Sequence, residues 1–234
     1  MCWTKGRGVG MCQHRAMKRK RLTRQDSREE TRKHLLDAAQ KLIAKKGLST
    51  ASVEDIAAAA GYTRGAFYSN FSSKDDLFLE LLRRDHNETH VQLAALVDDS
   101  LPLDHIHTRA RQIYGQLYRD SESFMNWSEA RMIAARDSKF RTKLNALLTE
   151  KRGEVAGFIE YFYRRVGIAA PIPANVMAMG FMSLFEGVQL SMLSSPDDMT
   201  TENAESVLAL FVESVMRLAR ISQVSNTPSS QSAA

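Results

Sequence analysis

The polar side chains between Arg64 and Lys74 are of types that proteins use to bind nucleic acid. Arg64 opens this stretch, and an arginine can form two parallel hydrogen bonds with the edge of a guanine. Lys74 follows Ser73 at the expected start of a long helix, where a cation beside free backbone N–H groups suits a phosphate. The chemistry expected here is therefore ion pairing and hydrogen bonding.

A helix-turn-helix over residues 53–71 would position these side chains. Ser52 is a suitable N-cap for a first short helix, and Gly61 supplies the left-handed residue that ends it. Thr63 can cap a second helix, Arg64–Asn70, with its apolar side chains facing inward and its polar ones facing outward. The outward residues suit a DNA groove.

Gly65 lies inside the second short helix, where glycine costs about 1 kcal/mol relative to alanine. This cost suggests that the backbone must approach another surface closely, and DNA is the obvious candidate. The same spacing also fits an ordinary helical hairpin on a protein surface, so both interpretations remain open on spacing alone.

The segment from Arg28 to Leu82 resembles the N-terminal domain of TetR-family (tetracycline-repressor-like) transcriptional regulators. The residues that carry the resemblance are Gly47, Gly61, Gly65, Tyr68, Phe71, Lys74 and Leu77. The resemblance implies a three-helix domain that binds a double-stranded DNA operator, with Tyr68 and Lys74 at phosphates. The expected DNA-contacting residues are Ser52, Thr63, Arg64, Gly65, Ala66, Tyr68, Ser69, Asn70 and Lys74.

The composition is that of a globular protein, with 44% hydrophobic and 25% charged residues. No apolar run reaches the length expected to span a membrane, and no secretory signal is recognised. The two cysteines, Cys2 and Cys12, form neither a disulfide framework nor a zinc spacing, which is compatible with a reducing compartment. We therefore expect a cytoplasmic protein with no membrane partner.

Positive charge is concentrated at the N-terminus. Residues 1–25 contain 8 Lys and Arg and no acidic residue, whereas residues 26–234 contain 24 basic and 27 acidic side chains. We expect residues 1–26 to be a disordered basic arm, in which Met17 could be the translation start. The arm is either a solvated tail or an additional contact to phosphates or the minor groove.

Helical periodicity continues along the rest of the chain. The expected fold is all-α with about nine helices: a helix-turn-helix DNA-binding domain, residues 27–84, precedes a helical ligand-binding and dimerisation domain, residues 85–224. Residues 225–234 have the composition of a disordered tail. Besides the two short helices, we expect helices at Arg28–Lys46, Lys74–Val97, Leu103–Tyr118, Glu122–Arg136, Ser138–Val166, Ala174–Leu193 and Glu202–Val224.

The second domain is not expected to form another nucleic-acid surface, because residues 85–234 contain 14 basic and 18 acidic side chains. Its last two helices are apolar beyond what the fold of one subunit usually covers. The TetR resemblance implies that these helices form a four-helix bundle with a second subunit. We therefore expect a homodimer through residues 174–193 and 202–224.

Aromatic and methionine side chains of the second domain could enclose a small hydrophobic or aromatic effector. Polar residues within the same pattern could orient it, since buried polar groups need partners. The expected ligand-binding residues are Phe124, Asn126, Trp127, Glu129, Phe158, Phe162, Met182, Phe185 and Gln189. For any single aromatic residue among them, a place in an ordinary hydrophobic core is the simpler explanation.

His86 and His90 lie one helical turn apart, a spacing that metal ligands use. Without a third ligand nearby, solvated histidines near a helix end are the simpler interpretation, and we expect no metal and no cofactor. The sequence contains no recognisable nucleophile and base, phosphate loop or pair of catalytic carboxylates. No catalytic residue is therefore expected.

The sequence thus predicts a sequence-specific DNA-binding regulator, most simply a repressor that leaves a palindromic operator when a ligand enters its second domain. The helix Lys74–Val97 is the expected lever. Alternatives within the same fold are an activator or a ligand-independent regulator. Alternatives from other classes are an architectural DNA-binding protein and a helical enzyme that modifies small molecules. Sequence preference in DNA binding would separate the regulators from the architectural protein, and turnover of a ligand would support the enzyme.

Overall fold

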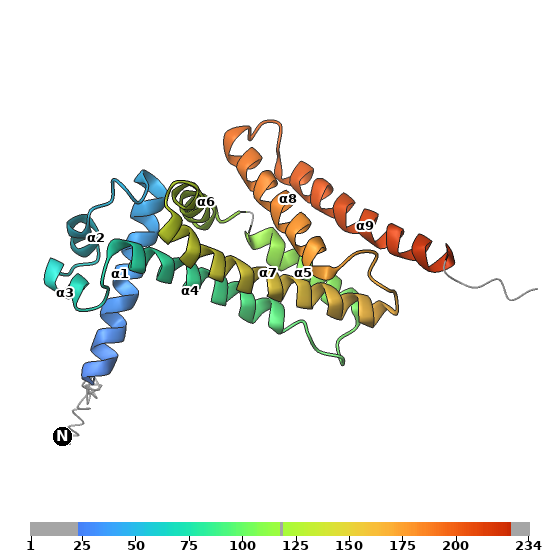
Figure 1. Ribbon diagram of the computed structural model, residues 1–234, viewed down its shortest axis with the longest axis horizontal. Coiled ribbons are helices and arrows are strands. Elements are labelled where there is room, and N and C mark those ends of the chain that lie inside the picture. The colour runs from blue at the N-terminus through green and yellow to red at the C-terminus, as the bar shows by residue number, and fades with distance from the viewer. Residues whose placement is uncertain (1–22, 118, 226–234) are drawn as a thin grey trace, which may run out of the picture.

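The computed structural model describes residues 23–117 and 119–225, which fold into helices joined by short turns (Figure 1). No strand occurs in these ranges, so the expected all-α fold is confirmed for them. The helices are α1 (Arg24–Lys46), α2 (Val53–Ala59), α3 (Arg64–Tyr68), α4 (Lys74–Ala94), α5 (Leu103–Leu117), α6 (Ser121–Arg136), α7 (Ser138–Val166), α8 (Ala174–Ser194) and α9 (Thr201–Ser225).

A capping box determines where α1 begins. The hydroxyl of Thr23 accepts a hydrogen bond from the backbone N–H of Asp26 (3.1 Å), and the carboxylate of Asp26 accepts one from the N–H of Thr23 (2.9 Å). The helix therefore begins at Arg24 rather than at the expected Arg28. Residues 23–26 belong to α1 and its cap instead of the basic arm, and residues 1–22 and 226–234 lie outside the described ranges.

The helix-turn-helix forms where the sequence predicts it. Ser52 caps α2 and Thr63 caps α3, each accepting a hydrogen bond from the backbone N–H three residues later (3.0 and 3.3 Å). Gly61, in the turn between them, has a φ of 79°, which lies in the left-handed region. The second helix ends at Tyr68, two residues earlier than expected.

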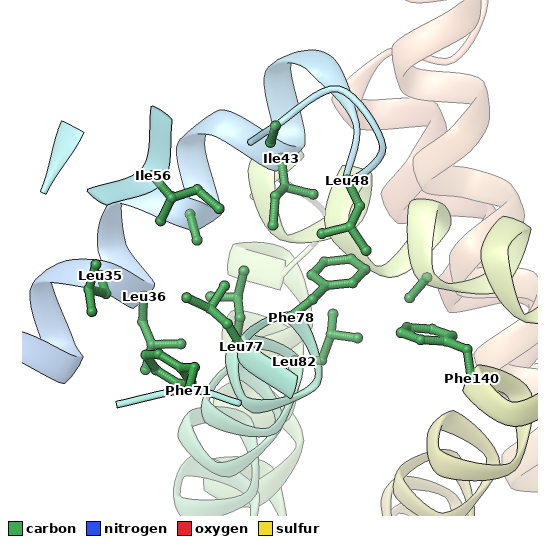
Figure 2. Packing of buried hydrophobic residues seen from close by; sticks show 14 of the residues in the cluster. Leu35, Leu36, Ile43, Leu48, Ile56, Phe71, Leu77, Phe78, Leu82 and Phe140 are labelled. Carbon is green, nitrogen blue, oxygen red and sulfur yellow. The ribbon is translucent and has the colours of Figure 1, made fainter. Parts of the chain in front are cut away.

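One hydrophobic core serves both the helix-turn-helix and the helices that follow it (Figure 2). Leu35 and Ile43 of α1 and Phe78 of α4 are almost completely buried in this core. Trp127 of α6 and Phe140 of α7 belong to the same cluster, and the rings of Phe78 and Phe140 stack with centroids 6.1 Å apart. The helices expected in a separate domain after residue 84 therefore share this core, and α4 runs through both parts.

The helices α8 and α9 lie at the opposite end of the molecule from α2 and α3 (Figure 1). A second cluster joins Met177 and Phe181 of α8 to Val155 of α7 and Leu208 of α9. By length and composition alone α8 could cross a membrane, contrary to the expectation that no run was long enough. Packing in this cluster accounts for the apolar residues on one side of α8.

His86 is buried, which corrects the expectation of two solvated histidines. Its Nε2 lies 3.3 Å from one carboxylate oxygen of Glu154 on α7, and Nδ1 of the exposed His90 lies 3.0 Å from the other. Burial lowers the pKa of His86, while the charge of Glu154 opposes that shift. These contacts join α4 to α7, and within the described part of the chain no three His, Cys, Asp or Glu are grouped to hold a metal.

Candidate nucleic-acid interface

The helix α3 rests on a buried anchor and presents polar side chains to solvent. Phe67 is fully buried beneath it. On the outer side Arg64, Gly65 and Ser69 are exposed, and Tyr68 is 49% exposed. This is the arrangement that a helix needs in order to enter a groove of DNA.

Two arginines of α1 fix the C-terminal end of α3. Nη1 of Arg32 donates a hydrogen bond to the carbonyl of Asn70 (2.7 Å), and Nη2 of Arg28 donates one to the carbonyl of Ser69 (3.3 Å). The guanidinium of Arg32 also lies 4.3 Å from the centroid of the Phe71 ring. Because the last carbonyls of a helix lack backbone partners, these contacts satisfy them and hold α3 at a fixed position.

Arg64 extends from the first position of α3 and forms an ion pair with Glu54 of α2. Its Nη1 lies 2.7 Å from a carboxylate oxygen of Glu54, and its guanidinium lies 5.5 Å from the centroid of the Tyr68 ring. Both partners of the ion pair are more than half exposed, so the pair adds little to stability. The guanidinium can therefore exchange Glu54 for another acceptor at small cost.

The other polar residues expected at DNA are engaged partly within the protein. Ser52 and Thr63 use their hydroxyl oxygens as helix caps, which leaves each O–H able to donate elsewhere. The side chains of Ser69 and Asn70 both donate to carbonyls four residues earlier in the chain (2.9 and 2.8 Å). Asn70 and Ala66 are half-buried, so they lie at the edge of the exposed surface.

Lys74, predicted at a phosphate, is engaged within the protein, and its phosphate contact stays a prediction. Its ammonium donates hydrogen bonds to the carbonyls of Leu48 and Ala51, at 2.9 Å for Ala51, and lies 3.4 Å from the carbonyl of Ser49. The three N–H groups of the ammonium are thus directed at the turn between α1 and α2. Lys74 closes the domain that carries α3.

Gly65 has room for a side chain within this chain. A Cβ at this position would meet only Oγ1 of Thr63, at an ordinary contact distance of 3.7 Å. Its φ is not in the left-handed region, so the backbone conformation does not require glycine. Close approach of DNA to Gly65 therefore stays a prediction.

A cavity of about 580 Å³ between α5, α7, α8 and α9 is a second candidate site. Its volume is in the range of small-molecule pockets. Phe158 and Phe162 of α7, both expected at a ligand, line this cavity. Met177 and Phe181, which are among the aromatic and methionine side chains expected to enclose an effector, line it too. The rest of its apolar wall could not be identified from the sequence and includes Ile106, Ile159, Tyr163, Leu208 and Phe211.

Trp127, Asn126 and Phe124 do not line the large cavity, contrary to expectation. Nε1 of Trp127 donates to the carboxylate of Asp85 on α4, and the amide of Asn126 donates to the carbonyl of Gln40 on α1 (3.1 Å). These two side chains line a smaller cavity of about 290 Å³ between α1, α4 and α6. They therefore join α6 to the helices of the helix-turn-helix domain.

Glu129, predicted to bind a ligand, does not line the large cavity and contacts the helix-turn-helix domain instead. Its carboxylate accepts a hydrogen bond from the N–H of Leu48 (2.9 Å), and a Cβ added at Gly47 would lie 3.1 Å from the same oxygen. The turn that precedes α2 is thus held from two sides, by Lys74 of α4 and by Glu129 of α6.

The last three expected ligand residues lie on α8, and none of them lines the large cavity. Nε2 of Gln189 donates to the carbonyl at the end of α5 (3.0 Å), while Met182 and Phe185 pack against the hydrophobic cluster of α8. Glu186, on the same helix, forms an ion pair with Arg131 of α6. These contacts connect α8 to α5 and α6.

The outer face of α8 is apolar and exposed. Between 42% and 58% of each of its large apolar side chains faces solvent, at Val176, Met179, Leu190 and Leu193. Gly187 is exposed on the same helix, and nothing lies within 4 Å of a Cβ added there. Exposed apolar side chains gathered along one helix in this way are typical of a protein interface.

Comparison with known proteins finds relatives of the helix-turn-helix domain. Residues 35–81 match the family described as bacterial regulatory proteins, tetR family. The HTH-type transcriptional regulator AcrR of Shigella flexneri is 49% identical over 61 residues, and the chain spans only 28% of the length of AcrR. The HTH-type transcriptional repressor AcnR of Corynebacterium diphtheriae is 28% identical over 192 residues, which cover 79% of this chain and 90% of AcnR.

Solved structures share the fold over most of the chain. The crystal structure of a TetR-family transcriptional regulator from Rhodococcus sp. has a TM-score of 0.68 and 23% identity, covering 80% of this chain and 99% of the other. A regulator from Saccharomonospora viridis in complex with choline has a TM-score of 0.65 and 21% identity, covering 79% and 96%. The likeness in fold therefore extends well beyond the helix-turn-helix domain.

Proposed function

We propose that this chain, whose residues 35–81 match the tetR family of bacterial regulatory proteins, is a homodimeric repressor that a small apolar effector releases from a palindromic operator. It is a DNA-binding transcriptional regulator rather than an enzyme. We assign it to the cytoplasm, with DNA as its partner and no membrane contact. Relatives named as transcriptional regulators and repressors support this assignment.

The exposed helix α3 is the observation that carries the DNA-binding part of the proposal. Phe67 anchors it, Arg28 and Arg32 hold its C-terminal end, and Arg64 stands at its N-terminal end in a weak ion pair. In a helix-turn-helix the N-terminal residues of the second helix contact base edges. We assign Arg64 to a base edge and Tyr68 to a neighbouring phosphate.

We propose that two chains pair through α8 and α9, which would account for a palindromic operator. The apolar outer face of α8 would be covered by the same face of a second copy, as in an isologous dimer. Leu210 of α9, which is 66% exposed, would add to the contact. A dimer presents two α3 helices, which fit half-sites one turn of DNA apart, about 34 Å.

Release by an effector is supported by the large cavity and by the contacts of α6. Arg131 joins α6 to Glu186 of α8, and Glu129 joins α6 to the turn before α2. A ligand that moves α8 or α7 would therefore move α6 and, through Glu129, the helix-turn-helix. We propose that α6 acts beside α4 as a lever, and that the ligand favours a conformation in which the two α3 helices no longer match the operator.

Selection of bound DNA from a random pool is expected to yield a palindrome, and Arg64→Ala is expected to lose about 1–3 kcal/mol of binding free energy on that sequence. The loss should be confined to specific DNA, because a base contact adds nothing on random sequence. Affinities on the selected and random duplexes at one salt concentration measure it.

Arg136→Ala is the matched control, since Arg136 is an exposed arginine at the C-terminal end of α6, outside the helix-turn-helix. It should leave both affinities unchanged. Equal losses for Arg64→Ala on selected and random DNA would make Arg64 a phosphate contact. Recovery of no preferred sequence would refute the repressor and favour an architectural protein.

Gly65→Ala is expected to stabilise the protein while weakening operator binding. Alanine is favoured over glycine in a helix by about 1 kcal/mol, and the added methyl group fits within the chain. The methyl group would instead meet the DNA backbone or bases. Urea unfolding and operator titration measure the two effects, and Gly153→Ala on α7 is the control that should change stability alone. Unchanged operator affinity for Gly65→Ala would remove Gly65 from the interface.

A further inference from the structure

Most of the wall of the large cavity is apolar, and its polar side chains are exposed apart from that of one buried tyrosine. Phe158, Phe162, Met177 and Phe181 supply much of the interior surface. Tyr163 of α7 also lines the cavity, and only 5% of this residue is exposed. Tyr163 is therefore the buried polar residue among those that line the cavity.

The hydroxyl of Tyr163 has no hydrogen-bond partner within the described part of the chain and is closed off from solvent. Buried polar atoms without partners are rare in folded proteins, because each loses its hydrogen bonds to water without replacement. Burial also raises the pKa of Tyr163, so the phenol stays protonated and can donate at neutral pH. The cavity is thus lined by a residue with an unsatisfied donor.

The charged residues of the cavity lie at its margin. Nη2 of Arg111 and Nη2 of Arg119, at the α5 end, lie 4.0 and 3.6 Å from the carboxylate of Glu205 on α9. All three side chains are at least 45% exposed, and Glu213, the fourth charged residue of the lining, is exposed as well. No charged group is available inside to compensate a charge that a ligand would carry in, so the interior selects against ions.

We propose that the effector is a neutral, largely apolar molecule with one hydrogen-bond acceptor, and that Tyr163 donates a hydrogen bond to that acceptor. This inference rests on the proposed function, because it names the class of effector that would enter the cavity. Since the hydroxyl is covered in the structure, the acceptor reaches it by displacing the side chains around it. Recognition of the acceptor is thereby coupled to a shift of α7 against its neighbours.

Benzophenone and diphenylmethane test the proposal, because they have similar shapes and only benzophenone carries a carbonyl acceptor. Equilibrium dialysis against the full-length protein should show benzophenone binding about tenfold more tightly than diphenylmethane. Tyr163→Phe should remove this preference by weakening benzophenone alone. Tyr163→Phe should fold normally, because it removes a hydroxyl that has no partner.

Tyr161→Phe is the matched control. Tyr161 lies two residues earlier on α7, is equally buried and also has a hydroxyl without a partner, but it does not line the cavity. This variant should keep the tenfold preference. Irradiation of bound benzophenone, which attaches it to nearby C–H groups, should label the cavity-lining residues of α5, α7, α8 or α9.

Several outcomes would overturn the inference: equal binding of the two probes to the unsubstituted protein, no binding of either, a preference that survives Tyr163→Phe, or labelling confined to other helices.

Measuring operator binding in the presence of each probe separates this inference from the proposed function. The preference for benzophenone could depend on Tyr163 while neither probe changes the affinity for the operator. That result would support the class of ligand and refute release of the operator by it. If benzophenone and diphenylmethane bind equally well and both release the operator, release by an effector is supported and the role of Tyr163 is refuted.

Discussion

Gly187→Arg is expected to convert the protein into folded monomers that bind the operator at least about a hundredfold more weakly. Gly187 lies on the exposed apolar face of α8, where an added side chain meets nothing within 4 Å of its Cβ. The substitution therefore leaves the single chain intact, while in a two-fold dimer it places two large cations against each other. A dimer gains about 10²–10⁴-fold in affinity from engaging two half-sites at once, and a monomer loses that gain.

Sedimentation and operator titration measure the two effects of Gly187→Arg, and circular dichroism checks the fold. Gly153→Arg is the control, because Gly153 is an exposed glycine of α7 with equally open surroundings. It should remain dimeric and bind the operator normally. A Gly187→Arg protein that sediments as a dimer would place the interface on another surface.

The helices could be predicted from the sequence because their signals are local. Each of the N-caps bonds a backbone N–H only three residues later in the chain, as seen at Ser52, Thr63 and Ser73. The positive φ of Gly61 is likewise a property of that residue alone. The predicted start of α1 is wrong because the capping box of Thr23 and Asp26 lies within a basic stretch that has no apolar period. The capping signal itself is local and present in the sequence.

The partners of polar side chains could not be predicted, because they come from distant parts of the chain. Glu129 binds the N–H of a residue 81 positions earlier, and Lys74 binds carbonyls 23 to 26 positions earlier. Helical periodicity shows which face of a helix is apolar but not which neighbour that face meets. Polar residues in an apolar pattern were therefore assigned to a ligand, although they join two parts of the protein.

The same limit explains the mixed result for the aromatic residues. Phe158 and Phe162 line the large cavity, whereas Trp127 lies in the core shared with α1 and α4. All three have the same spacing signal, because a side chain facing a cavity and one facing a neighbouring helix are equally apolar. Only the packing of α5, α7, α8 and α9 around an open space distinguishes them.

Lys74→Met is expected to lower the free energy of unfolding by about 3 kcal/mol while leaving the salt dependence of operator binding unchanged. The ammonium holds the carbonyls of Leu48 and Ala51, and hydrogen bonds to a charged donor contribute about 1.5–3 kcal/mol each without full additivity. Methionine keeps the length of the apolar stem and removes only the donors. A residue bound to a phosphate would instead lower the slope of log affinity against log salt by about one.

Urea unfolding and operator titration between low and moderate salt measure the two quantities for Lys74→Met. Lys41→Met, which removes an exposed lysine from α1, is the control and should leave stability nearly unchanged. Since the turn held by Lys74 leads into α2 and is also bound by Glu129, its loosening should weaken operator binding by the same factor at every salt concentration. Unchanged stability, together with a slope of log affinity against log salt that is smaller by about one, would show that Lys74 contacts a phosphate. Glu129 alone would then hold the turn.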